Sequence, residues 1–547
     1  MMPALVAHNL KGAMSAFVST LSGVWVHAKV LVRQFLTIPE SDVNDYPFAS
    51  SDIAQLHRLC SDPDAATIDE ATWRDMLVGP YLAELSKETS IFGQHVLYQR
   101  LRTGSVVMQS ERIRTLIDSP SQVQALHQAC KPLRRAEKEI ATVLFGDALP
   151  PVPAWVRWAW LLPLALIVSL AAVALSPMAW VPAFATLYIL LSTQMRYADR
   201  VEQWEQSMKA LQMLLRVVSQ QGGGDAAAAG KLNRKLARTP AEMLVPGLRA
   251  YLDWFAIANV KHYFMTVTQV RKNLPVLRGW FDRIANLEAD LALARHLLQT
   301  PSFCWAANSG SAAIALEATV HPLLPEAQPL TLTLQGKGAF ISGQNGVGKS
   351  TLLRTLGLNL IAARAFGLCY AKSASVPSLP VYASMQSEDS LLGGESLYMA
   401  ELRRAKELLT AADGPHPGVY IIDEIFRGTN HLESVSAAAS VLDMLAAKGV
   451  VVVSSHNLIL ASLLAHRLAP LCVAKAANGT LVLASGVLAH TNGIALLSQR
   501  GFGEEVEANA GKVFDWLSEY LAHPADCSAV LAEPVLPVSE AEVICRA

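Results

Sequence analysis

The spacing of apolar and polar residues changes once along the chain, near Pro301. Before this point, apolar residues recur at helical spacing, notably in Asp69–Leu116 and Lys231–Leu298. Such a period predicts helices that pack through one apolar face. After Pro301, short β-prone apolar runs alternate with helical stretches, which is typical of an α/β domain. The pattern therefore predicts an all-α core followed by a C-terminal α/β domain.

A run without charged residues, Trp158–Met195, interrupts the helical core. Ser176 and Pro177 divide it into two apolar segments, each about 26 Å long as a helix and slightly short of the ~30 Å hydrocarbon core of a bilayer. Trp and Tyr residues lie near the segment ends, and Arg157 and Arg196 flank the pair. The positive-inside rule then predicts a transmembrane helical hairpin in the inner (cytoplasmic) membrane, with both outer ends in the cytoplasm. A buried hairpin in a soluble helical domain is the alternative.

These changes divide the chain into six expected segments. The first is either a packed helix or a helix on a membrane surface, and a low-complexity run at 221–230 predicts a flexible loop. The expected boundaries are 1–68 for the N-terminal helical segment, 69–150 for the first half of the helical core, 151–196 for the transmembrane hairpin, 197–300 for the second half of the core (the lever), 301–499 for the α/β domain and 500–547 for a C-terminal helix and loose tail.

Composition supports a membrane segment and argues against several other classes. Of the 547 residues, 52% are hydrophobic and 17% are charged, which is unusually apolar for a soluble protein. The net charge of −1 gives no overall basic field that would attract nucleic acid. The seven cysteines form no CxxC pair. Their scatter argues for a reducing compartment and against a zinc site or a disulfide framework.

A strand-like run in the α/β half leads into a sequence suited to binding phosphate. Ala339–Ser342 is strand-like, and Gly343–Ser350 matches the phosphate-loop pattern G-x-x-x-x-G-K-[ST] (Walker A). Glycines let backbone N–H groups turn toward phosphate oxygens, and the following helix aims its positive end at them. Lys349 would reach the β- and γ-phosphates, and the Ser350 hydroxyl would bind Mg²⁺. A chance Gly-rich turn is the alternative.

Two further strand-like runs end in polar side chains. Val419–Asp423 is followed by Glu424, which is the Walker B arrangement. Asp423 would hold Mg²⁺, and Glu424 would polarise the attacking water. Gly449–Ser455 is followed by His456, which would contact the γ-phosphate or orient the water. Parallel strands bring such ends to one edge of a sheet. The alternatives are an ordinary strand end and a structural histidine.

A third run, Glu388–Leu402, lies between the two Walker motifs. Gly393 and Gly394 bend the chain, and Ser396 then stands at the start of a predicted helix. A helix start with a serine hydroxyl offers a second phosphate-binding surface, which need not face its own phosphate loop. An ordinary N-capped helix is the alternative.

Together these residues resemble the MutS family, the ABC-type ATPases of DNA mismatch repair. The family's phosphate loop, typically G-P-N-M-G-G-K-S-T, is similar to Gly343–Thr351, and its D-E-I-G-R-G-T is similar to Asp423–Thr429. Glu388–Leu402 resembles the family's signature helix. The remaining similarities are Thr89–Leu101, His321-Pro322 and Ser455-His456. The resemblance covers about 69–517, strongly in the ATPase and weakly in the helices.

The resemblance implies an α/β P-loop (ABC-type) ATPase domain that uses ATP and Mg²⁺ and pairs as a homodimer with composite sites. Ser396 would reach the γ-phosphate bound by the other subunit, and Gln386 would make a Q-loop-like contact. The implied catalytic residues are Glu424, His456 and Lys349, and the implied metal ligands are Ser350 and Asp423. The implied ATP-binding residues are Gly343, Gln344, Asn345, Gly346, Val347, Gly348, Lys349, Ser350 and Thr351.

Three departures from the family pattern shape the functional hypothesis. We find no mismatch-reading domain with a Phe-x-Glu wedge, Phe426 stands where the family has a small Gly, and the apolar pair stands about where the family inserts its DNA clamp. We therefore expect a membrane-anchored ATPase that moves a helical lever and acts on an unknown protein partner. The alternatives are a membrane-tethered DNA-binding protein of mismatch repair or recombination type, a transporter-like ABC half, and a non-hydrolysing nucleotide sensor.

Overall fold

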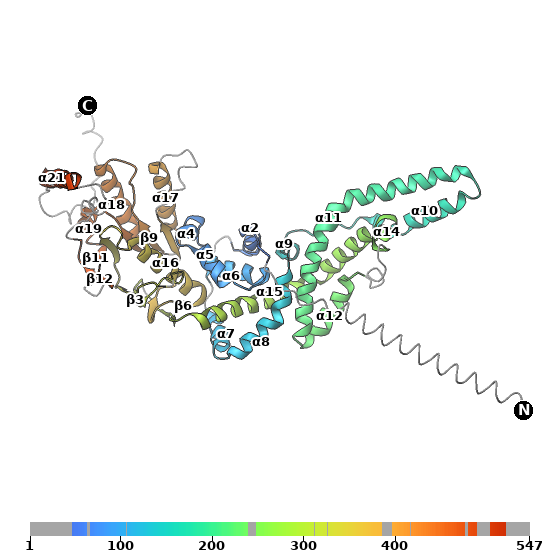
Figure 1. Cartoon of the computed structure of the whole chain (residues 1–547), viewed down its shortest axis with the longest axis horizontal. Coiled ribbons are helices and arrows are strands. Elements are labelled where there is room, and N and C mark those ends of the chain that lie inside the picture. The colour runs from blue at the N-terminus through green and yellow to red at the C-terminus, as the bar shows by residue number, and fades with distance from the viewer. Residues whose placement is uncertain are drawn as a thin grey trace, which may run out of the picture. The chain divides into compact units, whose positions relative to one another are not determined.

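The computed structural model describes residues 46–62, 66–104, 107–238, 248–310, 312–324, 326–385, 397–415, 417–475, 480–488 and 504–520. The helices that precede residue 300 are α2 (Ser50–Ile53), α3 (Gln55–Cys60), α4 (Glu70–Asp75), α5 (Val78–Leu85), α6 (Ile91–Thr103), α7 (Val107–Ile117), α8 (Pro120–Cys130), η1 (Lys131–Arg135), α9 (Ala141–Phe145), η2 (Ala154–Trp158), α10 (Leu161–Ala172), η3 (Pro177–Ala179), α11 (Trp180–Gln220), α12 (Gly224–Leu236), α14 (Leu248–Phe255) and α15 (Ala258–Gln299). The expected helical region is thus confirmed (Figure 1). Most of the expected N-terminal segment lies outside the described residues.

Helix α15 is the main support of the helical region. It packs against α6, α7, α8 and α11, and its buried side chains recur along its length. Phe281 on α15 meets Phe92 on α6 edge to face, with ring centroids 5.8 Å apart. Trp204 on α11 donates its indole N–H to the hydroxyl of Thr266 on α15 at 2.9 Å. Aromatic burial of this kind supplies large apolar area and satisfies the indole donor at the same time.

A buried carboxyl group joins α6 to α15. The Ser90 hydroxyl and the Gly93 N–H at the start of α6 both donate to Glu288, which is 5% exposed. Burial raises the pKa of Glu288 to about 7, although these hydrogen bonds oppose the shift. The folded chain therefore keeps a proton on Glu288 over a range of pH in which an unfolded glutamate, with a pKa of 4.5, has lost it.

This difference predicts a pH-dependent stability. The contribution of Glu288 to the free energy of unfolding should fall by up to roughly 3 kcal/mol as the pH rises from about 4.5 to about 7, and it should be constant outside that window. Glu288→Gln should flatten the dependence, so that the variant melts above the wild type at pH ~8 and close to it at pH ~5. Thermal unfolding of the detergent-purified protein measures this, with the exposed Glu111→Gln as control. Parallel pH curves for wild type and Glu288→Gln would contradict the assignment.

A second buried pair joins the same two helices. Arg100 on α6 donates to Asp290 on α15 at 2.7 Å and to Asn286 at 2.8 Å. Both side chains of the ion pair are 3% exposed. Arg112, whose side chain is 56% exposed, approaches the other oxygen of Asp290 at 3.1 Å. Charges removed from water in this way require such partners, because an unpaired buried charge is very costly.

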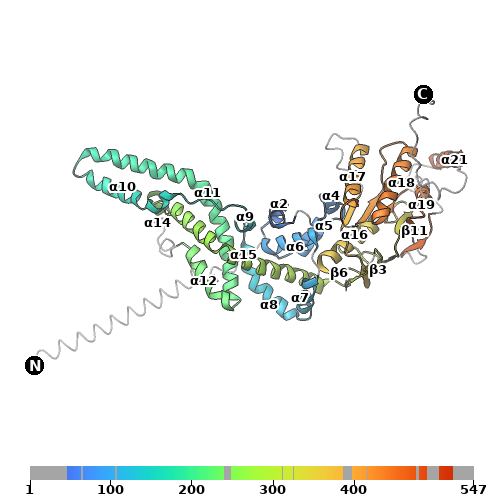
Figure 2. The same ribbon diagram turned by 180° about the vertical axis from the view of Figure 1, so that it is seen from behind.

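The apolar run folds as α10 and α11, which lie side by side and are joined through η3 (Figures 1 and 2). Helix α10 has 12 residues, or about 18 Å, and is too short to cross a ~30 Å hydrocarbon core. It is shorter than expected because Trp158 belongs to the 3₁₀ turn η2 and the helix ends at Ala172. Within the described ranges, one helix, Pro177–Gln220, is long and apolar enough to span a membrane. Of the two predicted spanning segments, only the second is therefore long and apolar enough to span a membrane.

The predicted loop at 221–230 is wrong for most of its length, because α12 begins at Gly224. Four alanines follow Asp225, and alanine has the highest helix propensity. Asp225 lies in the first turn, where a carboxylate favours the helix, and it pairs with Arg283 of α15 at 2.8 Å. Gly222 and Gly223 therefore precede the helix, and Gly224 is its first residue.

The C-terminal half confirms the expected α/β sheet domain. Among the residues that the structure describes, its central sheet has six strands in the order β12-β11-β5-β10-β9-β8, parallel except for β12. These strands are β5 (Gly338–Gly343), β8 (Val381–Ser384), β9 (Val419–Asp423), β10 (Val450–Ser454), β11 (Leu468–Lys475) and β12 (Leu481–Ser485). Every residue of β5, β9 and β10 is buried, which is why these strands are continuous apolar runs.

Helices and a second sheet accompany the central sheet. The helices are α16 (Lys349–Phe366), α17 (Leu397–Ala412), α18 (His431–Lys448), α19 (Ile459–Leu463) and α21 (Glu504–Tyr520). The second sheet has the order β2-β7-β3-β4, and β1 pairs with β6. Their strands are β1 (Cys304–Trp305), β2 (Ala307–Asn308), β3 (Ile314–Thr319), β4 (Leu330–Leu334), β6 (Leu368–Cys369) and β7 (Ser373–Val376).

Candidate functional site

The phosphate loop connects the buried strand β5 to the start of α16. Gly346 has φ +74° and Gly348 has φ +106°, a backbone region that glycine enters without strain. Gln344, Asn345 and Gly346 are exposed at the tip of the loop. Because α16 begins at Lys349, its unpaired N–H groups and its positive end lie at the loop. The local geometry is suited to an anion.

Lys349 lies between the phosphate loop and the two acids, Asp423 and Glu424, at the end of β9. Its ammonium donates to the carbonyl oxygens of Gly343 at 2.9 Å and Gln344 at 3.3 Å. Burial lowers the pKa of Lys349, whereas the nearby carboxylates of Asp423 and Glu424 raise it. The structure thus brings Lys349 close to two acids that follow it by 74 and 75 positions in the sequence.

Strand β10 lies between β5 and β9, so its end separates the phosphate loop from the Walker B acids. Ser454 ends β10 opposite Asp423, and its hydroxyl donates to that carboxylate. Asp423 is 4% exposed. In the part of the chain that the structure describes, no group of three or more His, Cys, Asp or Glu side chains is arranged to hold a metal ion. One carboxylate and the Ser350 hydroxyl still fit Mg²⁺, which takes few protein ligands together with phosphate oxygens and waters.

Glu424 and His456 meet directly. The Nε2 atom of His456 lies 2.8 Å from Glu424 Oε1, and the Glu424 N–H donates to the Ser454 carbonyl at 2.9 Å. The hydrogen bond from His456 lowers the pKa of Glu424, whereas burial raises it. The charge of Arg427 also lowers this pKa. Glu424 is therefore an ionised carboxylate in fixed orientation, able to accept a hydrogen bond from a water.

The backbone after Walker B is strained. Glu424 has φ +56° and Phe426 has φ +58°, in the left-handed region that costs a residue other than glycine of order 1 kcal/mol or more. Phe426 is 1% exposed and meets the ring of Tyr398 on α17 at 67°, with centroids 6.0 Å apart. A Cβ at Gly428 would approach the Tyr398 backbone nitrogen to 2.7 Å. This strained turn is thus fixed by close packing against the first turn of α17.

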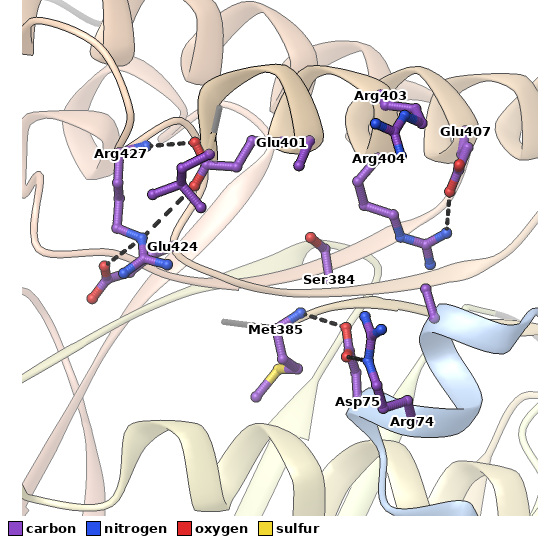
Figure 3. Close-up of a pocket in the computed structure, with 13 residues that line it drawn as sticks. Arg74, Asp75, Ser384, Met385, Glu401, Arg403, Arg404, Glu407, Glu424 and Arg427 are labelled. Carbon is purple, nitrogen blue, oxygen red and sulfur yellow. Dashed lines mark hydrogen bonds and ion pairs between the residues drawn. The ribbon is translucent and has the colours of Figure 1, made fainter. Parts of the chain in front are cut away.

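A cavity of about 290 Å³ lies beside Glu424, lined by α4, the end of β8 and α17 (Figure 3). The Nε of Arg427 lies 3.3 Å from Glu424 and 3.8 Å from Glu401 of α17. Glu401 also accepts hydrogen bonds from the backbone N–H groups of Arg427 at 2.9 Å and Gly428 at 3.3 Å. Helix α17 therefore holds the segment that follows the Walker B acids.

Beside this cavity, five residues, which we call the α4 joint, connect the sheet to the helical region. Met385 donates its N–H to Asp75 at 2.8 Å, and Ala383 donates its N–H to the Thr72 hydroxyl at 2.9 Å. Arg404 of α17 donates to the Ala383 carbonyl at 2.6 Å and to Thr72 at 3.2 Å. Three parts of the fold thus share one hydrogen-bonded contact.

Two predicted site residues, Ser396 and Gln386, lie outside the described residues. Sequence reasoning assigned no role to Ser454, Arg427 or Glu401. Arg427 carried a usable signal, because it follows Glu424 by three residues in the D-E-I-F-R-G-T run. The contact with Glu401 had no such signal, since it depends on where α17 packs.

Comparison with known proteins gives matches that centre on this region. Residues 339–515 match the family model of MutS domain V. Endonuclease MutS2 of Thermus thermophilus is 34% identical over 169 residues, which are 30% of this chain and 21% of that protein. DNA mismatch repair protein MutS of Thermus aquaticus is 28% identical over 207 residues, 36% of this chain and 25% of that protein. DNA mismatch repair protein msh3 of Botryotinia fuckeliana is 27% identical over 188 residues, 32% of this chain and 16% of that protein.

The chain thus covers a quarter or less of the length of these relatives. The matched region contains the phosphate loop, both Walker B acids, Ser454 and His456. The domain that carries the candidate site is therefore similar to domain V of the MutS proteins.

Proposed function

We propose that this chain is a membrane-anchored, MutS-like ATPase that binds ATP with Mg²⁺ and hydrolyses it to ADP and phosphate. The observation that carries the proposal is the cluster of Lys349, Asp423, Glu424 and His456 at the carboxyl edge of the sheet, beside the phosphate loop. The match to MutS domain V over the same residues supports it.

Each residue has a role in a direct in-line attack of water on the γ-phosphate, without a covalent intermediate. Lys349 would stabilise the charge on the β- and γ-phosphates, and the backbone N–H groups of the loop would bind their oxygens. Glu424 would align and polarise the water, and His456 would keep Glu424 ionised and oriented. Asp423 and Ser350 would hold Mg²⁺, which neutralises the phosphate charge and orients the nucleotide.

We propose that two such domains close on ATP as a homodimer. Ser396 would then contact the γ-phosphate held by the other subunit, and hydrolysis would reopen the pair. The α4 joint supports a lever mechanism, because it binds the end of β8 and helix α17 to the first helices of the helical region. A shift of α17 or of the end of β8 during closure would therefore move α4 and the helices packed on it.

The membrane anchor is supported by the exposed apolar surface of α10 and α11. In the apolar window of Pro177–Gln220, 22% of the residues are buried, whereas the core helix of a soluble protein is mostly buried. Exposed side chains include Ile167, Val181 and Phe184, each more than 60% exposed. Such a continuous apolar surface is stable in lipid and unfavourable in water. The ATPase domain would lie in the cytoplasm, at the inner membrane.

A second candidate function has one observation in its favour. Two of the relatives described above carry the printed name DNA mismatch repair protein, and residues 339–515 of this chain match the family model of MutS domain V. A membrane-tethered protein that binds DNA is therefore the alternative. The net charge of −1 gives it no general electrostatic support.

The test is ATP hydrolysis by the full-length protein purified in detergent, with and without duplex DNA, together with flotation on lipid vesicles. Hydrolysis that is indifferent to DNA, by protein that floats with vesicles, is the expected result. Stimulation by duplex DNA that decreases with added salt would favour the alternative. Absence of hydrolysis under all conditions would overturn the ATPase assignment, and failure to float would overturn the membrane anchor.

A further inference from the structure

Helix α14 (Leu248–Phe255) presents Tyr251, Trp254 and Phe255 outward and Asp253 inward. Tyr251, Trp254 and Phe255 are 67%, 46% and 47% exposed. Asp253, on the other side of the helix, accepts two hydrogen bonds from Arg238 at 3.1 Å and 3.0 Å. An amphipathic helix on a water-soluble body normally buries its apolar face and exposes its charges. The orientation of α14 is the reverse.

The charged face is held in this orientation by the body of the protein. Arg238 and Asp253 are 12% and 16% exposed, and Arg238 also approaches Glu205 of α11 at 3.9 Å. Helix α14 packs against both α11 and α15. The outward face is therefore a consequence of how α14 is anchored, because Asp253 has its partner on the protein side.

The outward face of α14 meets the apolar surface of α11 near the end of the apolar run, at Leu191. Leu191 of α11 and the three aromatic residues of α14 line one apolar hollow of about 220 Å³. Leu191 precedes Arg196, the first charged residue after the apolar run, by five residues, or about 7.5 Å along the helix. Arg196 and Arg200, in the next turns, are exposed. The aromatic face thus lies at the boundary between the apolar and the charged part of α11.

We propose that α14 is an interfacial helix, whose aromatic face enters the bilayer at the boundary between headgroups and acyl chains. The inference rests on the proposed membrane anchor and deepens it. A bilayer fits this face better than a protein partner does, because the face is continuous with the exposed apolar surface of α10 and α11. Trp and Tyr are the residues that occupy the interfacial level, and the arginines of α11 suit phosphate headgroups.

The test uses Trp254 as its own reporter. Full-length wild type and Trp254→Phe are reconstituted in vesicles of phosphatidylcholine and phosphatidylglycerol, with acyl chains either plain or brominated near the headgroup. The difference between their emissions isolates the fluorescence of Trp254, one of 11 tryptophans. Trp305→Phe is the matched control, since Trp305 lies in β1 of the α/β half. ATP hydrolysis by each variant checks that it is folded.

The expected result is that brominated lipid removes most of the Trp254 emission and leaves that of Trp305 unchanged. If the protein floats with the vesicles and Trp254 is not quenched, the interfacial helix is overturned, the membrane anchor stands, and a protein surface covers α14 instead. If the protein does not float at all, the anchor itself fails and the inference fails with it.

Discussion

Replacing Glu424 with Gln is expected to reduce ATP hydrolysis by roughly 10²–10⁴-fold, the usual contribution of a positioned general base. The substitution keeps the size of the side chain and leaves an oxygen that can accept from His456. It removes the negative charge that polarises the water. Nucleotide binding should remain, because Lys349 and the phosphate loop are unchanged. Phosphate release and the binding of a fluorescent ATP analogue, measured on the same preparation, separate the two effects.

Two controls define this experiment. Glu326→Gln, on the exposed loop between β3 and β4, should leave hydrolysis unchanged. Lys349→Ala should weaken nucleotide binding as well as hydrolysis, since it removes the cation that meets the β- and γ-phosphates. Hydrolysis by Glu424→Gln within about threefold of wild type, far less than the loss of a general base causes, would exclude Glu424 from the reaction.

Removing Arg100 is expected to give the largest loss of stability, about 3–5 kcal/mol, because Arg100→Met leaves Asp290 as a buried charge. Arg112 would remain beside Asp290, but its side chain is half exposed and cannot replace the bonds that Arg100 makes. Since the pair lies between α6 and α15, the helical region should unfold first. Chemical unfolding monitored by circular dichroism measures the loss.

Two further variants show what the pair contributes. Lys87→Met breaks an exposed ion pair with Glu84 and should cost about 1 kcal/mol or less. The double variant Arg100→Met with Asp290→Leu should recover much of the lost stability, because it removes the unpaired charge together with its partner. If Arg100→Met alone were as mild as Lys87→Met, the pair would not be buried in solution.

The parts of the site that depend on contiguous sequence could be predicted. The strand before the phosphate loop and the start of the following helix at Lys349 both follow from local signals, namely an apolar run, glycines and a helix-prone stretch. That the ends of β9 and β10 lie at the same edge of the sheet was also predictable, because parallel buried strands place their polar ends at one edge. Local chemistry determines these features, so a single sequence is sufficient.

The parts that depend on tertiary packing could not be predicted. Nothing in the sequence states that β10 lies between β5 and β9, or that Glu401 binds the N–H of Arg427, 26 residues later. The α4 joint brings Asp75 to Met385 across more than 300 residues. Hydropathy also overestimated the length of α10, because an apolar run does not show at which residue a helix ends.

Helix α11 continues without a break from the apolar run into the body of the helical region, over 41 residues or about 60 Å. If its first part lies in lipid, one end of this continuous helix is in a bilayer, whose thickness varies with its lipids. Transmembrane helices adjust to that thickness by tilting. A change in tilt of about 10° at Arg196 would displace the far end, ~36 Å away, by ~6 Å. Acyl-chain length would then shift the part of α11 that packs on α12 and α15, and the bilayer would act on the helical region through one continuous helix.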